Sequence, residues 1–277
     1  MAIPEDNALP RAEGAPAALG EKFLELVAVV ERLRSQDGCP WDRQQTPQSL
    51  LPYLLEETYE VMESVTADDA AALQEELGDL LLHIVFQGSL AQEAGRFTLA
   101  ESLDTVIRKL TRRHPHVFGD QRVEGGTAGV RQRWEAQKQR EKGRASLLDG
   151  VPRTLPALNR ARRVQEKAAS VGFDWPQVAG VWAKFMEEIE ELRTACAAQD
   201  AGAMQEEFGD VLFSLVNLGR FLQLSGEDAL RQSINKFEHR FRGIEQELAR
   251  RGRGIEEATL EEMDGIWNRL RREGKHV

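Results

Sequence analysis

Acidic residues recur at a spacing of three in two segments of the second half of the chain. Glu188 and Glu191 form one such pair, and Glu207 and Asp210 form another. Side chains three positions apart share one face of a helix, so two antiparallel neighbouring helices would bring both pairs together. Four clustered carboxylates repel one another unless a cation neutralises them. Oxygen ligands without His or Cys favour Mg²⁺, or Mn²⁺, over Zn²⁺. The pattern therefore predicts a site for a hard divalent cation.

The first half of the chain contains the same acidic pattern. The four equivalent carboxylates lie 131 positions earlier, at Glu57, Glu60, Glu76 and Asp79. The surrounding residues match as well, since 74–82 reads QEELGDLLL and 205–213 reads QEEFGDVLF. Solvated acids drift after a duplication, because any polar residue serves on an exposed face. Their retention in both halves favours a second metal site over the simpler interpretation of a solvated helix face.

The order of the matching blocks predicts a duplicated domain. GCPWD in the first half matches GFDWP in the second, upstream of the acidic block in both cases. Gly and Pro clusters between the halves indicate a linker. We expect a flexible tail over residues 1–20, an N-terminal domain over 21–145, a linker over 146–156 and a C-terminal domain over 157–277.

The periodicity of apolar residues is helical almost everywhere. It predicts helices over 23–33, 51–65, 68–91 and 99–113, and strand-like alternation is absent. We predict an all-α fold of two related helical-bundle domains. Each half has four or five helices, and so small a unit often completes its core by pairing with another copy. A homodimer is therefore expected.

Composition excludes several classes of function. The net charge is −10, which argues against binding of a nucleic acid polymer. No apolar stretch approaches the roughly 20 residues of a membrane helix, so no membrane partner is expected. The two cysteines, Cys39 and Cys196, cannot form a disulfide framework and indicate a reducing, cytoplasmic location.

A di-iron carboxylate bundle is the alternative metal site. That site needs Glu-x-x-His pairs on two helices, whereas this chain has an Asp in place of the His. His83 lies four residues after Asp79, but its counterpart in the second half is Ser214. We therefore expect His83 to be a partly buried or peripheral residue.

The sequence resembles the MazG family, the all-α nucleoside triphosphate pyrophosphohydrolases, from about residue 23 to residue 275, including the tandem arrangement of full-length bacterial members. Besides the acidic blocks, the resemblance rests on GCPWDRQQT at 38–46, RKLTRRHPHVFGD at 108–120, KAASVGFDW at 167–175 and NKFEHRF at 235–241. It implies hydrolysis of nucleoside triphosphates to the monophosphate and pyrophosphate with Mg²⁺, by an oligomer that is usually a dimer. It also implies metal binding by Glu188, Glu191, Glu207 and Asp210.

The resemblance also suggests which side chains hold the substrate. Lys236 and Arg240 are four apart and could contact phosphate oxygens, Trp267 could stack on a base or pack as an anchor, and Lys184 lies one turn before Glu187. The predicted catalytic residues are Glu187, Glu188 and Glu191, with Glu187 outside the metal ligands as a candidate base. The predicted substrate-binding residues are Lys184, Glu187, Glu206, Lys236, Arg240, Trp267 and Arg271.

The two halves are not expected to work equally. Tyr53 stands in the first half where the second has Lys184, and tandem members of the family often depend on the C-terminal domain. We therefore expect the C-terminal site to be the principal catalyst. A non-catalytic nucleotide-binding regulator and a structural dimerisation module remain open as alternatives, and the base preference stays undetermined.

Overall fold

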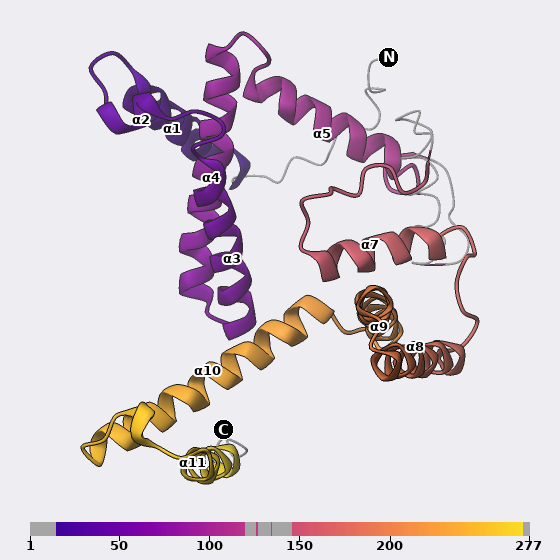
Figure 1. Ribbon diagram of the computed structural model, residues 1–277. Coiled ribbons are helices and arrows are strands. Elements are labelled where there is room, and N and C mark those ends of the chain that lie inside the picture. Colours follow the sequence, from indigo (N-terminus) through magenta and orange to yellow (C-terminus); the bar gives the residue numbers. More distant parts are fainter. Residues whose placement is uncertain (1–14, 120–125, 127–133, 135–145, 274–277) are drawn as a thin grey trace. The chain divides into compact units, whose positions relative to one another are not determined.

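The computed structural model describes residues 15–119, 126, 134 and 146–273 (Figure 1). The chain divides into two units, residues 1–124 and 125–277. Most of residues 120–145, the end of the predicted N-terminal domain, lies outside the described residues, so the boundaries 21–145 and 146–156 stay predictions. A helix begins at Ala15, within the predicted tail of residues 1–20, and residues 1–14 lie outside the described part.

The described residues of the first unit form helices joined by turns and short loops. Its buried core joins Val30 and Leu50 to three residues of one long helix, Val85, Phe86 and Leu90. The helices are α1 (Ala15–Arg34), α2 (Pro40–Gln44), α3 (Leu51–Ala67), α4 (Ala70–Glu93) and α5 (Leu99–Arg113).

The second unit repeats the central helical pair and adds a longer helix after it. Contacts join α8 to α9, α7 to α9 and α10 to α11. One apolar cluster, formed by Ile244, Leu248 and Ile266, holds α10 and α11 together. The elements are α7 (Ala157–Ala169), α8 (Val178–Ala198), α9 (Ala201–Phe221), α10 (Gly226–Arg250), the 3-10 turn η2 (Ile255–Glu257) and α11 (Leu260–Glu273).

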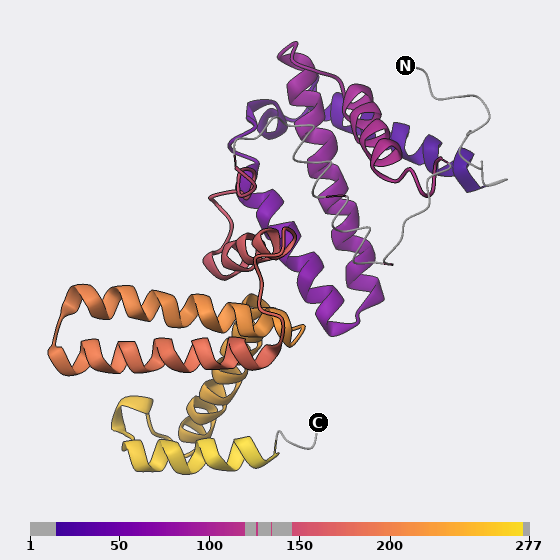
Figure 2. The same ribbon diagram turned by 90° about the vertical axis from the view of Figure 1, so that its right-hand side faces the viewer.

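The same tight turn closes the hairpin of each unit. Asp68 ends α3 in the left-handed conformation with φ 55°, and Gln199 ends α8 with the same φ. The next residue caps the following helix: the Asp69 carboxylate accepts hydrogen bonds from two backbone N–H groups of α4, and Asp200 does the same in α9. Figure 2 shows the two helices of each hairpin running side by side. The turn sets their register and hence which carboxylates face each other.

The all-α prediction is confirmed: no strand occurs among the described residues. The predicted helices are all present, and the one expected over 23–33 is longer, at Ala15–Arg34. None of the helices in the described part combines the length and apolar character that crossing a bilayer requires.

Candidate metal centres

The C-terminal acidic residues converge between α8 and α9. Carboxylate oxygens of Glu188, Glu207 and Asp210 all lie within 4.8 Å of one another. Glu188 is buried, with 7% of its surface exposed. The fourth predicted ligand, Glu191, forms a hydrogen bond with Glu188, and burial together with this bond raises the pKa of Glu191. A raised pKa is the expected consequence of crowding carboxylates with too little positive charge.

The N-terminal half builds an equivalent group between α3 and α4. Oxygens of Glu57, Glu76 and Asp79 lie within 4.8 Å of one another. Burial, a hydrogen bond with Glu60 and the charges of the neighbouring carboxylates raise the pKa of Glu57 to about 7. Burial and the charge of Glu60 also raise the pKa of Glu76. The four predicted ligands of this half therefore form one electrostatic unit.

The donors of both groups fit a hard divalent cation. Each offers carboxylate oxygens from two facing helices, close enough to surround one ion, and no thiolate. Burial and the neighbouring carboxylates raise the pKa of Glu57 and of Glu191, as expected for acids crowded with too little positive charge. A metal ion would relieve this repulsion. Both groups of acidic residues can thus bind a metal.

Lys184 is the cation that contacts the C-terminal group. Its Nζ lies 2.8 Å from Oε1 of Glu188 and donates a hydrogen bond of 2.9 Å to Oε1 of Glu187. These two bonds raise the pKa of Lys184. Glu187 is therefore bound to the lysine at the edge of the group. Glu206 is exposed on α9 beside Glu207.

A histidine makes the corresponding contact with a glutamate in the N-terminal group. His83 Nε2 lies 3.8 Å from Oε1 of Glu57, and its ring stacks on Tyr53. Burial lowers the pKa of His83. The expectation that His83 is partly buried is confirmed, but it faces the acidic group and is not peripheral to it. The spacing of four from Asp79 places His83 on the face of α4 that carries the acidic residues, but it did not show the contact with Glu57, which belongs to another helix.

The remaining predicted substrate residues lie on α10 and α11. The Arg240 guanidinium lies over the Trp267 ring, 5.3 Å from its centroid. Trp267 also packs on Phe237, at 5.3 Å between centroids, and on the apolar cluster of α10 and α11. Lys236 and Arg271 are exposed. Among the described residues, no hydrogen bond or ion pair joins these side chains to the acidic groups, so a role of Trp267 as packing anchor is what the contacts support.

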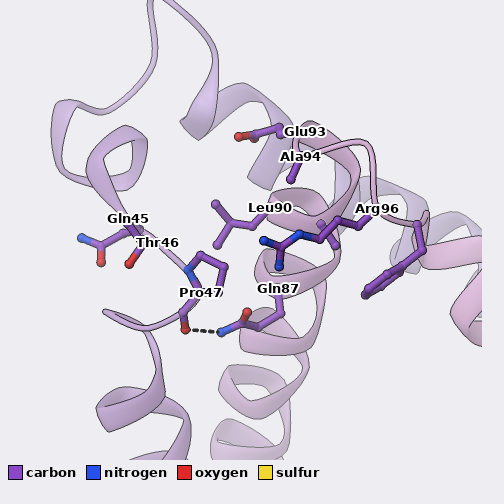
Figure 3. A pocket seen from close by; sticks show the side chains of 10 residues that line it. Gln45, Thr46, Pro47, Gln87, Leu90, Glu93, Ala94 and Arg96 are labelled. Carbon is purple, nitrogen blue, oxygen red and sulfur yellow. Dashed lines mark hydrogen bonds between the residues drawn. The ribbon is translucent and has the colours of Figure 1, made fainter.

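An open cavity of about 450 Å³ lies elsewhere in the first unit (Figure 3). On one side, Gln87 Nε2 donates a hydrogen bond of 3.0 Å to the Pro47 carbonyl and ties the start of α3 to α4. Glu93 on its wall is held by Arg34 through hydrogen bonds of 2.7 and 2.6 Å. None of the eight predicted metal ligands lines this cavity. It is separate from the acidic groups.

Comparisons with known proteins point to the segments that form the two hairpins. The sequence profile of the MazG nucleotide pyrophosphohydrolase domain matches residues 45–118 and 179–243, the segments that contain the two acidic groups. The nucleoside triphosphate pyrophosphohydrolase/pyrophosphatase MazG of Thermotoga maritima is 44% identical over 254 residues, covering 91% of this chain and 96% of the relative. The nucleoside triphosphate pyrophosphohydrolase of Escherichia coli K12 is 43% identical, covering 90% and 96%. With two matching segments and relatives aligned over nearly their full length, this chain belongs to the MazG nucleotide pyrophosphohydrolase family.

Proposed function

We propose that the chain hydrolyses nucleoside triphosphates to the monophosphate and pyrophosphate at its C-terminal acidic group, with Mg²⁺ as the metal. Family membership makes the chain a nucleotide pyrophosphohydrolase. The observation that supports the site is the convergence of Glu188, Glu207 and Asp210 within 4.8 Å. Mn²⁺ is expected to substitute for Mg²⁺, because both prefer oxygen ligands.

Both the protein and a nucleoside triphosphate are negatively charged, so the proposed metal ion is what allows the substrate to bind. When bound, Mg²⁺ would neutralise the phosphates and stabilise the leaving pyrophosphate. Glu188, Glu191, Glu207 and Asp210 would hold it. Glu187 lies next to these ligands in the chain without belonging to the convergent set, and its proposed role is to orient or deprotonate the water that attacks the α-phosphorus.

Basic side chains complete the proposed substrate site. Lys184 is paired with two carboxylates, and in the proposed complex it exchanges one of them for a phosphate oxygen. Lys236 and Arg240, one turn apart on α10, bind phosphate as point charge and planar fork. The remaining predicted contacts are Glu206, Trp267 and Arg271.

Pyrophosphate release from a panel of ribo- and deoxyribonucleoside triphosphates with Mg²⁺ tests the proposal. Glu191→Gln and Glu60→Gln are a matched pair, because each replaces the equivalent carboxylate of one half by an uncharged side chain of the same shape. We expect Glu191→Gln to abolish release and Glu60→Gln to retain it. Equal loss in both variants would mean two coupled sites. No release from any triphosphate by the parent protein would refute the enzymatic function and favour the nucleotide-binding regulator.

We also propose that the chain works as a homodimer in the cytoplasm. The hairpin of the second unit leaves large apolar side chains about half exposed, among them Trp182, Met186, Phe208 and Phe213. Covering such a surface with a second copy removes it from water. Light scattering should give about twice the chain mass of 31.1 kDa, and a mass equal to one chain would contradict the dimer.

A further inference from the structure

The two acidic groups differ in the side chain that contacts the equivalent glutamates Glu57 and Glu188. At the repeat distance of 131 residues, Tyr53 corresponds to Lys184, and His83 corresponds to Ser214. The C-terminal group thus has a lysine on α8, the helix that carries Glu188, and a serine on the facing helix α9. The Ser214 hydroxyl donates to the Val211 carbonyl of its own helix at 3.0 Å and leaves the contact with the glutamate to the lysine.

In the N-terminal group the contact comes from the facing helix. Tyr53 carries no charge, and its ring stacks on the imidazole of His83 with centroids 6.4 Å apart and planes 6° from parallel. This stacking fixes the plane of the imidazole. His83 Nε2 lies 3.8 Å from Oε1 of Glu57, with 12% and 19% of the two side chains exposed. The histidine is thus held beside a carboxylate of the acidic group with little access to water.

The other ring nitrogen identifies the tautomer. His83 Nδ1 is buried and has no hydrogen-bond partner. A neutral imidazole carries one N–H, and an N–H on Nδ1 would be buried without an acceptor, at a cost of about 1–3 kcal/mol. The proton therefore belongs on Nε2, the nitrogen that faces Glu57. With its proton there, His83 cannot be a metal ligand through that nitrogen, and it can act as a donor to the carboxylate.

We propose that His83 is a positioning residue of the N-terminal metal site, which donates a hydrogen bond from Nε2 to Glu57 and so performs from α4 the role that Lys184 performs from α8. The inference rests on the proposed binding of a metal by Glu57, Glu60, Glu76 and Asp79. At 3.8 Å the contact is longer than a hydrogen bond. A rotation of the Glu57 side chain that turns one oxygen to the histidine closes the remaining gap.

The neutral donor also gives the two groups different charges. Lys184 cancels one negative charge of the C-terminal carboxylates, whereas His83 cancels none in the N-terminal group. The C-terminal group has in Lys184 a cation that can meet the phosphates, and the N-terminal group has no equivalent on α3.

Binding of Mn²⁺ alone to the full chain tests the role of His83. Glu188→Gln with Glu207→Gln removes the C-terminal site, so that titration calorimetry and the paramagnetic resonance signal of free Mn²⁺ report the N-terminal one. In this background we expect His83→Ala to weaken Mn²⁺ binding by about 10- to 100-fold, the usual effect of removing a partner that orients a metal ligand. His83→Gln should restore most of the affinity, because its amide donates a neutral N–H near the same place. Ser214→Ala is the matched control in the other half and should change nothing.

The outcomes separate positioning from folding. Unchanged affinity in His83→Ala would overturn the inference, and so would a His83→Gln variant that binds as weakly as His83→Ala while both melt at the parent temperature. A background variant that binds no Mn²⁺ would overturn the N-terminal site and the inference with it. Pyrophosphate release by His83→Ala in the otherwise native chain decides the proposed activity separately, since the C-terminal group is intact there.

Discussion

Lowering the pH should weaken metal binding at the N-terminal group by a predictable factor. The pKa of Glu57 is raised to about 7, and a carboxylate must lose its proton to bind a metal. The ionised fraction of Glu57 rises from about one in eleven at pH 6 to about ten in eleven at pH 8, so affinity should rise about 10-fold over this range.

Calorimetry measures this proton competition directly. In the variant with Glu188→Gln and Glu207→Gln, Mn²⁺ would be titrated at pH 6, 7 and 8 in two buffers of different ionisation enthalpy. At pH 7 about half a proton should leave Glu57 for each ion bound, because pH and pKa are then equal. Glu57→Gln is the control. It should bind more weakly at every pH and lose the part of the pH dependence that belongs to Glu57.

A flat affinity between pH 6 and pH 8 would refute the reasoning. So would binding at pH 7 without proton release. Either result would mean that Glu57 is already ionised in the metal-free protein, and that the burial and neighbouring charges around it do not hold a proton in place of the metal.

Three further outcomes follow from the contacts described above. In the metal-free protein the folded state holds the Glu57 proton more tightly than the unfolded chain, because its pKa of about 7 lies above the ordinary value of 4.5. The free energy of unfolding should therefore fall as the pH rises from about 5 to 8, and added Mn²⁺ should reverse this fall. Urea unfolding at each pH measures both effects. Asp200→Ala removes the cap of α9 and should cost about 1 kcal/mol, measured by the same method; no change would mean that solvent replaces the cap. Leu248→Ala empties a fully buried position between α10 and α11 and should cost about 2–5 kcal/mol, seen as a lower melting temperature in calorimetry, and a smaller loss would mean that the cluster collapses around the gap.

The hairpins were predictable because their determinants are local. The i,i+3 spacing of Glu188 and Glu191 places both on one face of α8, whatever the rest of the chain does. In the structure Asp69 and Asp200 cap the second helix of each hairpin, because a side chain with an acceptor can satisfy some of the first N–H groups. With a short turn between two antiparallel helices, the convergence of the acidic pairs follows.

Contacts between helices could not be predicted in the same way. The acidic pairs predicted which face of α4 turns toward α3, and His83, four residues after Asp79, lies on that face. Spacing along the chain did not show that its ring lies 3.8 Å from Glu57. Nor did it show that Arg240 lies over Trp267, since these residues are on different helices and their contact depends on the packing of α10 against α11.

The sequence by itself determined the helices, their duplication and the acidic residues that could hold a metal, because capping, spacing and repetition are properties of neighbouring residues. The tertiary structure decided the electrostatics: which carboxylates have a raised pKa, and whether a lysine or a histidine stands beside each group. These properties depend on burial and on distances of a few ångströms between helices, and a pKa responds to both.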